Sequence, residues 1–210
     1  MRRIFIGQMC LVVFMVASMS CNNKGVADKE KQMLDLVDSS LRYLKSGDVM
    51  LRSGNSFTSM LLANFNTKNK TYSHTGILII EEGTPYVYHA IGGEDNPDAI
   101  LRKEHLYFWC NPSFNSGFAA VRYDLDSNEV RGVISKVRSY YYNKVKFDMD
   151  FDLETDNSLY CTEMIYKAIG EATGNVNWLI PSKAANKSYI AVDDLFLHPA
   201  AKFICKVSFK

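Results

Sequence analysis

The chain has 210 residues, of which 47% are hydrophobic and 22% are charged. This length supports one sizeable hydrophobic core, so we expect a single domain behind a leader. The formal net charge is +1, and the basic residues alternate with acidic ones along the sequence. This pattern excludes the basic stripe of a nucleic-acid-binding protein, and no nucleic-acid partner is expected.

The first twenty residues have the pattern of a secretory signal. Arg2 and Arg3 precede an apolar run over 4–16, and small residues then lead to Cys21. A cysteine directly after a small residue resembles a bacterial lipoprotein signal, which implies lipidation of Cys21 and a membrane anchor in the cell envelope. An ordinary cleaved signal, with Cys21 incidental, is the alternative. The chain therefore divides into a signal peptide (1–20), a lipidated cysteine with its tether (21–31) and a domain (32–210).

The domain alternates helical and extended patterns. Apolar residues at helical spacing predict helices over 28–45, 56–65, 126–142 and 191–197. Ser56 is placed to cap the second of these helices, which carries Phe57, Met60, Leu61 and Leu62. Apolar and β-branched runs predict strands over 48–52, 74–80, 85–91, 100–102, 118–123 and 203–209. We expect an α+β fold in which an antiparallel sheet packs against helices.

Two histidines lie on a predicted hairpin. A turn centred on Glu82-Gly83 makes the numbers of opposed residues sum to 165, so His89 lies opposite Gly76. His74 is then the diagonal neighbour of His89 on the same face of the sheet, close enough for the two side chains to meet. Gly76 leaves room for a ring to lie over its strand. A register slip of one residue would separate the two histidines.

Cys161 follows an irregular acidic stretch and begins an apolar-periodic segment that includes Ile165, Ala168 and Ile169. We place it in the first turn of a helix, where free backbone N–H groups and the helix dipole lower a thiol pKa. A buried core cysteine in an amphipathic helix is the alternative. Once the leader is removed with Cys10, Cys110 and Cys205 also remain, and a disulfide between those two stays open.

The acidic stretch over 148–156 invites comparison with a calcium loop. Its alternating apolar residues and its lack of a central glycine argue against an EF-hand. No metal site and no cofactor are expected.

The histidines and the cysteine also occur in a familiar order. Four blocks, Gly47-Asp48-Val49, Tyr72-Ser73-His74-Thr75-Gly76-Ile77, Tyr88-His89-Ala90 and Leu159-Tyr160-Cys161-Thr162-Glu163-Met164, resemble the circularly permuted papain-like hydrolases. Within the NlpC superfamily the resemblance is to the YiiX-like branch, with the lecithin:retinol acyltransferase-like enzymes as relatives. It covers about 46–207. The third catalytic position is often a glutamate in the YiiX-like branch, whereas here it is His89, as in the acyltransferase-like branch.

The resemblance implies an exported cysteine hydrolase that cleaves an amide, ester or thioester bond. Cys161 would be the nucleophile, His74 its proton acceptor and donor, and His89 the residue that orients His74. The backbone N–H groups of Cys161 and Thr162 would stabilise the oxyanion. The implied substrates are murein peptides, other small amides or lipid-linked acyl groups. The oligomeric state is not predicted. An acyltransferase and a non-catalytic surface-binding lipoprotein are the alternatives.

His89 must be neutral to accept a hydrogen bond from His74. We therefore expect activity to fall on acidification, with a midpoint within about one unit of the free imidazole value of roughly 6.5.

Overall fold

The computed structural model describes residues 28, 31–93, 96, 98–184 and 187–209. The predicted signal peptide, Cys21 and most of the tether lie outside these described residues. No helix within the described part of the chain is long and apolar enough to cross a membrane.

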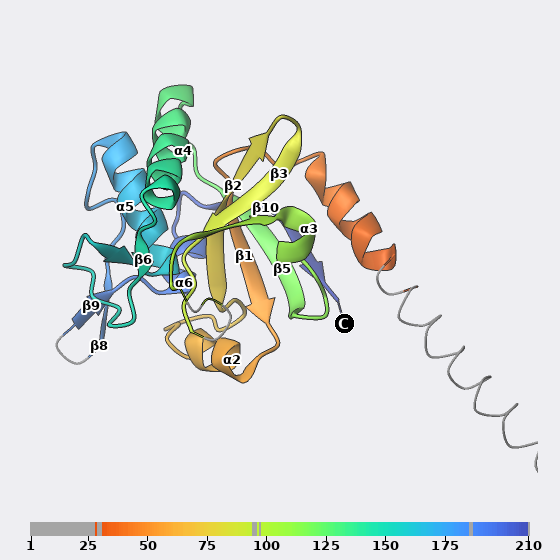
Figure 1. The fold of residues 1–210 in the computed structure, drawn as a ribbon, viewed down its shortest axis with the longest axis horizontal. Helices are drawn as coiled ribbons and strands as arrows, with labels where there is room; N and C mark the ends of the chain where they lie inside the picture. The colour runs from red at the N-terminus through yellow and green to blue at the C-terminus, as the bar shows by residue number, and fades with distance from the viewer. Residues whose placement is uncertain (1–27, 29–30, 94–95, 97, 185–186, 210) are drawn as a thin grey trace, which may run out of the picture.

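A six-stranded sheet forms the centre of the structure (Figure 1). Every pairing within it is antiparallel, and the strand order is β10-β5-β1-β2-β3-β4. The strands are β1 (Val49–Gly54), β2 (His74–Glu81), β3 (Thr84–His89), β4 (Arg102–His105), β5 (Asn115–Arg122) and β10 (Lys202–Ser208). The predicted mixed α+β fold with an antiparallel sheet is therefore confirmed.

The remaining elements are helices and short two-stranded ribbons. The helices are α2 (Phe57–Ala63), α3 (Leu106–Trp109), α4 (Ser127–Tyr142), α5 (Cys161–Thr173) and α6 (Val192–Phe196), and a further helix covers 31–41. The ribbons pair β6 (Lys146–Phe147) with β7 (Ser158–Leu159), and β8 (Ser182–Ala184) with β9 (Lys187–Tyr189). Figure 1 shows α4 and α5 side by side on one side of the sheet, and the two helices contact each other.

Alternation along the strands gives the sheet two buried faces, since successive side chains point to opposite sides. Leu51, Ile77 and Ile79 contribute to the core that includes α5. Met50 and Leu78 point the other way, into a second core that the helix over 31–41 and α3 complete. Both faces of this antiparallel sheet are therefore covered.

Most predicted boundaries shift by a few residues, and two of the differences have structural consequences. The first helix ends at residue 41 and not at 45, because the chain turns at 42–43 and reaches Gly47, whose φ of +96° a helix cannot contain. The segment 104–109, for which the sequence patterns predict neither a helix nor a strand, forms the end of β4 and the helix α3. This second difference matters for the site, because it places Glu104 on a strand beside β3.

Candidate active site

The hairpin of β2 and β3 has the predicted register. Ile77 pairs with Tyr88 and Glu81 with Thr84, so opposed residue numbers sum to 165. A Cβ atom at position 76 would lie 2.6 Å from Val87 Cγ1, 2.7 Å from the Tyr88 carbonyl oxygen and 3.0 Å from His89 Cβ. A glycine is therefore required opposite His89, as the sequence predicts.

The two histidine side chains meet as expected. His74 Nε2 lies 2.9 Å from His89 Nδ1, and the two rings are nearly perpendicular to each other with centroids 5.1 Å apart. Both side chains are buried against the indole of Trp109, whose centroid lies 5.3 Å from the His74 ring and 4.8 Å from the His89 ring. Trp109 therefore excludes water from one side of the histidine pair.

Glu104 extends the pair to a third member that the sequence patterns did not reveal. Its Oε2 atom lies 3.3 Å from His89 Nε2, within ion-pair distance although not aligned as a good hydrogen bond. Arg52, which pairs with His74 across β1 and β2, approaches the same oxygen at 4.0 Å and lies over the Trp109 ring. Strand alternation would have placed Glu104 diagonal to His89 if β4 had been predicted over 102–105.

Glu104 determines which nitrogens of the histidines carry protons. Burial acts to raise the pKa of Glu104, but His89 and the guanidinium groups of Arg52 and Arg102 outweigh burial and lower it. An ionised carboxylate can only accept, so His89 Nε2 carries the proton and His89 Nδ1 is the acceptor. His74 Nε2 must then donate to His89, which leaves His74 Nδ1 without a proton and available as a base.

Both histidines are neutral near pH 7. Burial, assisted by the charge of Arg52 and by His89, lowers the pKa of His74 well below its ordinary value. Burial also lowers the pKa of His89 and outweighs the opposing effect of Glu104. His89 can therefore accept the hydrogen bond from His74, as its predicted role requires, and His74 is a neutral base.

Cys161 is the first residue of α5, as predicted, and Tyr160 is its N-cap. Glu163 Oε2 accepts from the backbone N–H of Tyr160 at 3.1 Å, so this acid caps the helix, as a residue of the first turn can. Thr162 Oγ1 donates to the Ile190 carbonyl at 2.6 Å, and Tyr160 Oη accepts from the Ile190 N–H at 2.9 Å. These bonds fix the start of α5 in place.

The expectation of a lowered Cys161 pKa is wrong. Burial raises the pKa of the thiol to about 11, and hydrogen bonds from the backbone N–H groups of Thr75, Thr162 and Cys161 offset only part of that rise. The side chain is only 9% exposed, and desolvation of a thiolate costs more than the helix start returns. The same amide contacts place the thiol beside Thr75, which directly follows His74, and at the two predicted oxyanion donors.

The other two cysteines are free thiols. Cys110 is buried, and burial raises its pKa well above the usual value, with nearby Cys205 adding to the effect. The disulfide that the sequence left open is not formed in this structure.

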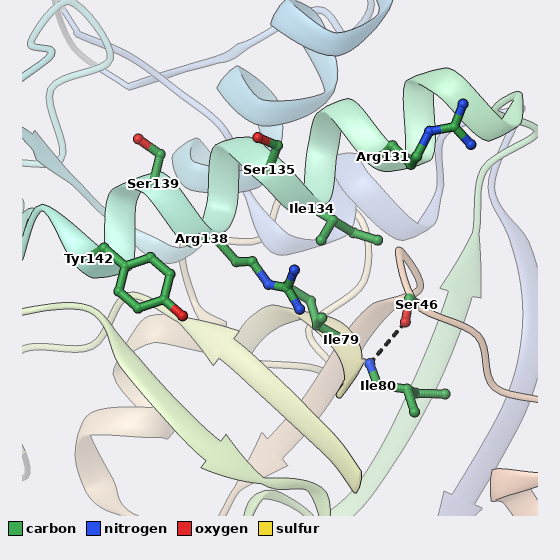
Figure 2. A pocket seen from close by; sticks show the side chains of 9 residues that line it. All are labelled: Ser46, Ile79, Ile80, Arg131, Ile134, Ser135, Arg138, Ser139 and Tyr142. Atoms are coloured by element: carbon green, nitrogen blue, oxygen red, sulfur yellow. Dashed lines mark hydrogen bonds between the residues drawn. The ribbon is translucent and has the colours of Figure 1, made fainter. Parts of the chain in front are cut away.

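A hollow of about 730 Å³ lies elsewhere, between α4 and the end of β2. Figure 2 shows Arg138 reaching from α4 toward Ile79, with Tyr142 on the same helix. Arg138 donates to Glu81 at 2.9 Å, so its charge is already met by a carboxylate of the protein. The lining includes neither Cys161 nor either histidine of the pair, so this hollow is separate from the buried histidine cluster.

Comparison with known proteins agrees with this fold and extends no further. No family model matches the chain, and no curated protein matches it. A solved structure does match the chain, and the match shows that the fold is YiiX-like. The crystal structure described as that of metalloprotein yiiX from Escherichia coli O157:H7 superposes with a TM-score of 0.62 and 19% sequence identity, covering 78% of this chain and 98% of that chain. In the described part of the present chain, no group of three or more His, Cys, Asp or Glu residues is arranged to hold a metal ion.

Proposed function

We propose that this protein is an exported cysteine hydrolase that cleaves an amide, ester or thioester bond with a Cys161-His74-His89 triad. One observation carries the proposal: two buried histidines are joined at 2.9 Å, and the backbone N–H of Thr75, the residue after His74, reaches the thiol of Cys161 at the start of a helix. The YiiX-like fold supports it, and membership of the permuted papain-like NlpC superfamily belongs to the same proposal.

In the proposed mechanism the thiol remains protonated until substrate arrives. His74 Nδ1 removes the thiol proton while Cys161 Sγ bonds to the carbonyl carbon, so the cost of a buried thiolate is incurred only in the transition state. The negative charge moves to the carbonyl oxygen, which the N–H groups of Cys161 and Thr162 stabilise. The imidazolium of His74 then gives its proton to the leaving nitrogen, oxygen or sulfur.

The second half of the reaction releases the acyl group from Cys161. His74 Nδ1 takes a proton from water, whose oxygen attacks the thioester, and the thiol regains its proton as it leaves. His89 holds the His74 ring, and Glu104 holds the proton of His89 on Nε2. An alcohol or amine in place of water would make the protein an acyltransferase.

The test is a screen of amide, ester and thioester substrates with matched variants. Cys161→Ala and Cys161→Ser should remain folded and lose turnover, whereas Cys205→Ser should retain it, because Cys205 lies on β10 away from the histidine pair. Equal rates in the wild type and the purified Cys161→Ala protein would contradict the mechanism. Failure of any substrate to turn over, with no covalent adduct on Cys161 after exposure to acyl electrophiles, would favour a binding role.

We also propose that the protein is an envelope lipoprotein attached through Cys21. The arginine pair, the apolar run and the small residues before Cys21 support this localisation. Mass analysis of the mature N-terminus should find a lipidated Cys21. An unmodified N-terminus beyond residue 21 would reject the anchor without affecting the hydrolase proposal.

A further inference from the structure

The apolar stripe of α2 faces solvent. Phe57, Met60 and Leu61, with Phe65 just beyond the end of the helix, recur at the spacing of one helical face, a pattern that normally packs into a core. In this structure α2 buries none of its residues, and Phe57 is 71% exposed. The helix is nevertheless well formed, because Ser56 Oγ accepts from the backbone N–H of Ser59 at 3.1 Å.

The exposed surface continues beyond α2. Phe114, also exposed, belongs to the segment before β5, and its carbonyl accepts from the backbone N–H of Asn55 at 2.9 Å. The Phe114 ring lies 6.0 Å from the exposed ring of Phe108. We call these six side chains the apolar rim: Phe57, Met60, Leu61, Phe65, Phe108 and Phe114. A cluster of exposed apolar side chains of this kind is characteristic of a contact with a membrane or another molecule.

The charges near the apolar rim favour a membrane over another molecule as the partner. No acidic residue occurs between Asp48 and Glu81, or between Glu104 and Asp124, so the segments that build the apolar rim carry no carboxylate. Lys68 and Lys70 lie in the loop between α2 and β2 and are exposed. The acidic segment over 148–156 adjoins the rim through the ring contact of Phe65 with Phe151, at the far end of α2 from Phe57. Exposed aromatic and aliphatic side chains beside lysines match an anionic lipid interface.

The apolar rim lies at the same end of the sheet as the candidate active site. β1 ends at Gly54 immediately before α2, and β2 begins at His74. The Gly54 backbone N–H donates to Ser73 Oγ at 3.1 Å, which ties the approach to α2 to the residue before His74. Figure 1 shows α2 below the sheet, beside the end of β1. A contact made by this rim therefore sets the distance between the histidine pair and the contacted surface.

We propose that the apolar rim docks onto an anionic lipid bilayer, with Phe57 and Met60 inserted among the acyl chains and Lys68 and Lys70 at the headgroups. This contact is distinct from the proposed lipid on Cys21, because it involves the folded domain itself. It turns the end of the sheet at which β2 begins toward the membrane. The contact does not depend on the hydrolase activity.

The test measures insertion at single positions in the full-length protein. Phe57→Trp and Met60→Trp place a reporter in the apolar rim, and Tyr43→Trp places one at a comparably exposed position before β1, at the opposite end of the strands. Each is added to vesicles of equal parts phosphatidylcholine and phosphatidylglycerol, with and without brominated acyl chains. The fluorescence of the parent, which contains Trp109 and Trp178, is subtracted, and circular dichroism checks that each variant is folded.

We expect F57W and M60W to show a blue shift and several-fold stronger quenching by brominated lipid than Y43W. Reversal of charge in Lys68→Glu/Lys70→Glu should reduce the quenching of F57W. Equal quenching of F57W and Y43W would overturn the proposal. So would a blue-shifted F57W signal before vesicles are added, in a protein with the mass of a dimer, because a second copy would then cover the rim.

Discussion

His74 Nε2 and His89 Nδ1 lie 2.9 Å apart across the β2–β3 hairpin, and Gly76 is what permits this distance. With Glu104 behind His89, the contact has a direction: His74 donates, His89 accepts, and His74 Nδ1 is free of a proton. In the proposed mechanism, His89 would therefore orient His74 while Glu104 orients His89.

The raised pKa of Cys161 predicts slow chemical labelling at neutral pH. A pKa of about 11 makes the thiolate rare near pH 7, so alkylation by iodoacetamide should accelerate as the pH rises toward that value. The measurement is the rate of adduct formation on Cys161 by mass spectrometry, in the Cys205→Ser background to remove the partly exposed thiol. A labelling rate that is already at its plateau near pH 7 would mean that the site holds a preformed thiolate and imidazolium.

Acidification should inactivate the protein at a lower pH than a free imidazole implies. Burial lowers the pKa of both His74 and His89 from the ordinary 6.5, so both remain neutral below that pH. Turnover should fall with an apparent midpoint below pH 6.5, and this midpoint belongs to the coupled pair and not to either histidine alone. A pH profile of kcat/KM on a non-ionising substrate checks this. A midpoint above the free imidazole value would contradict the burial of the pair.

Replacement of Glu104 by glutamine should slow turnover without removing the nucleophile. An amide can donate or accept, so it no longer keeps the proton of His89 on Nε2. We expect a loss of about tenfold to a hundredfold, smaller than the roughly 10⁴-fold cost of replacing a carboxylate that touches the base itself. Glu104 raises the pKa of His89, so its removal should also move the acid limb to lower pH.

The control for Glu104→Gln is Glu82→Gln, which neutralises an exposed carboxylate at the turn of the hairpin. It should leave both the rate and the acid limb unchanged. A purely structural role for Glu104 would lower stability and the yield of active protein but would not shift the acid limb. An unshifted limb in Glu104→Gln would therefore remove Glu104 from the mechanism.

Glu163 should make the domain less stable as pH rises. Burial raises the pKa of this helix-capping acid to about 7, against 4.5 for a free side chain, although Lys167 opposes the shift. The folded state then binds a proton that the unfolded state has released, so this contribution is present at low pH and lost as pH rises through about 7. Glu163→Gln retains an acceptor for the Tyr160 N–H and does not titrate.

Urea unfolding at about pH 5 and about pH 8 measures this effect. Relative to Glu163→Gln, the wild type should lose roughly 2–3 kcal/mol of unfolding free energy between the two pH values, from the roughly 1.36 kcal/mol that each pKa unit represents. The comparison cancels the other titrating groups, including the buried histidines. Equal losses in the two proteins would mean that Glu163 titrates as an exposed acid.

Local patterns in the sequence were sufficient to determine the hairpin, its register and the start of α5. The two-residue turn fixes the pairing of β2 with β3, and strand alternation then puts His74 and His89 on the same face of the sheet. The change from an acidic, aperiodic stretch to a helical period places Cys161 in the first turn, where a free N–H group is available. These features depend on residues close together along the chain.

Only the tertiary structure decided the protonation of the site and the exposure of α2. Burial is a property of everything packed around a group, so the helix start at Cys161 could not reveal that desolvation raises its thiol pKa. Glu104 reaches His89 because β4 pairs with β3 beyond a connection that local patterns did not resolve. The period of α2 identifies its apolar stripe but not the direction in which it points, because that direction depends on which neighbours the rest of the chain supplies.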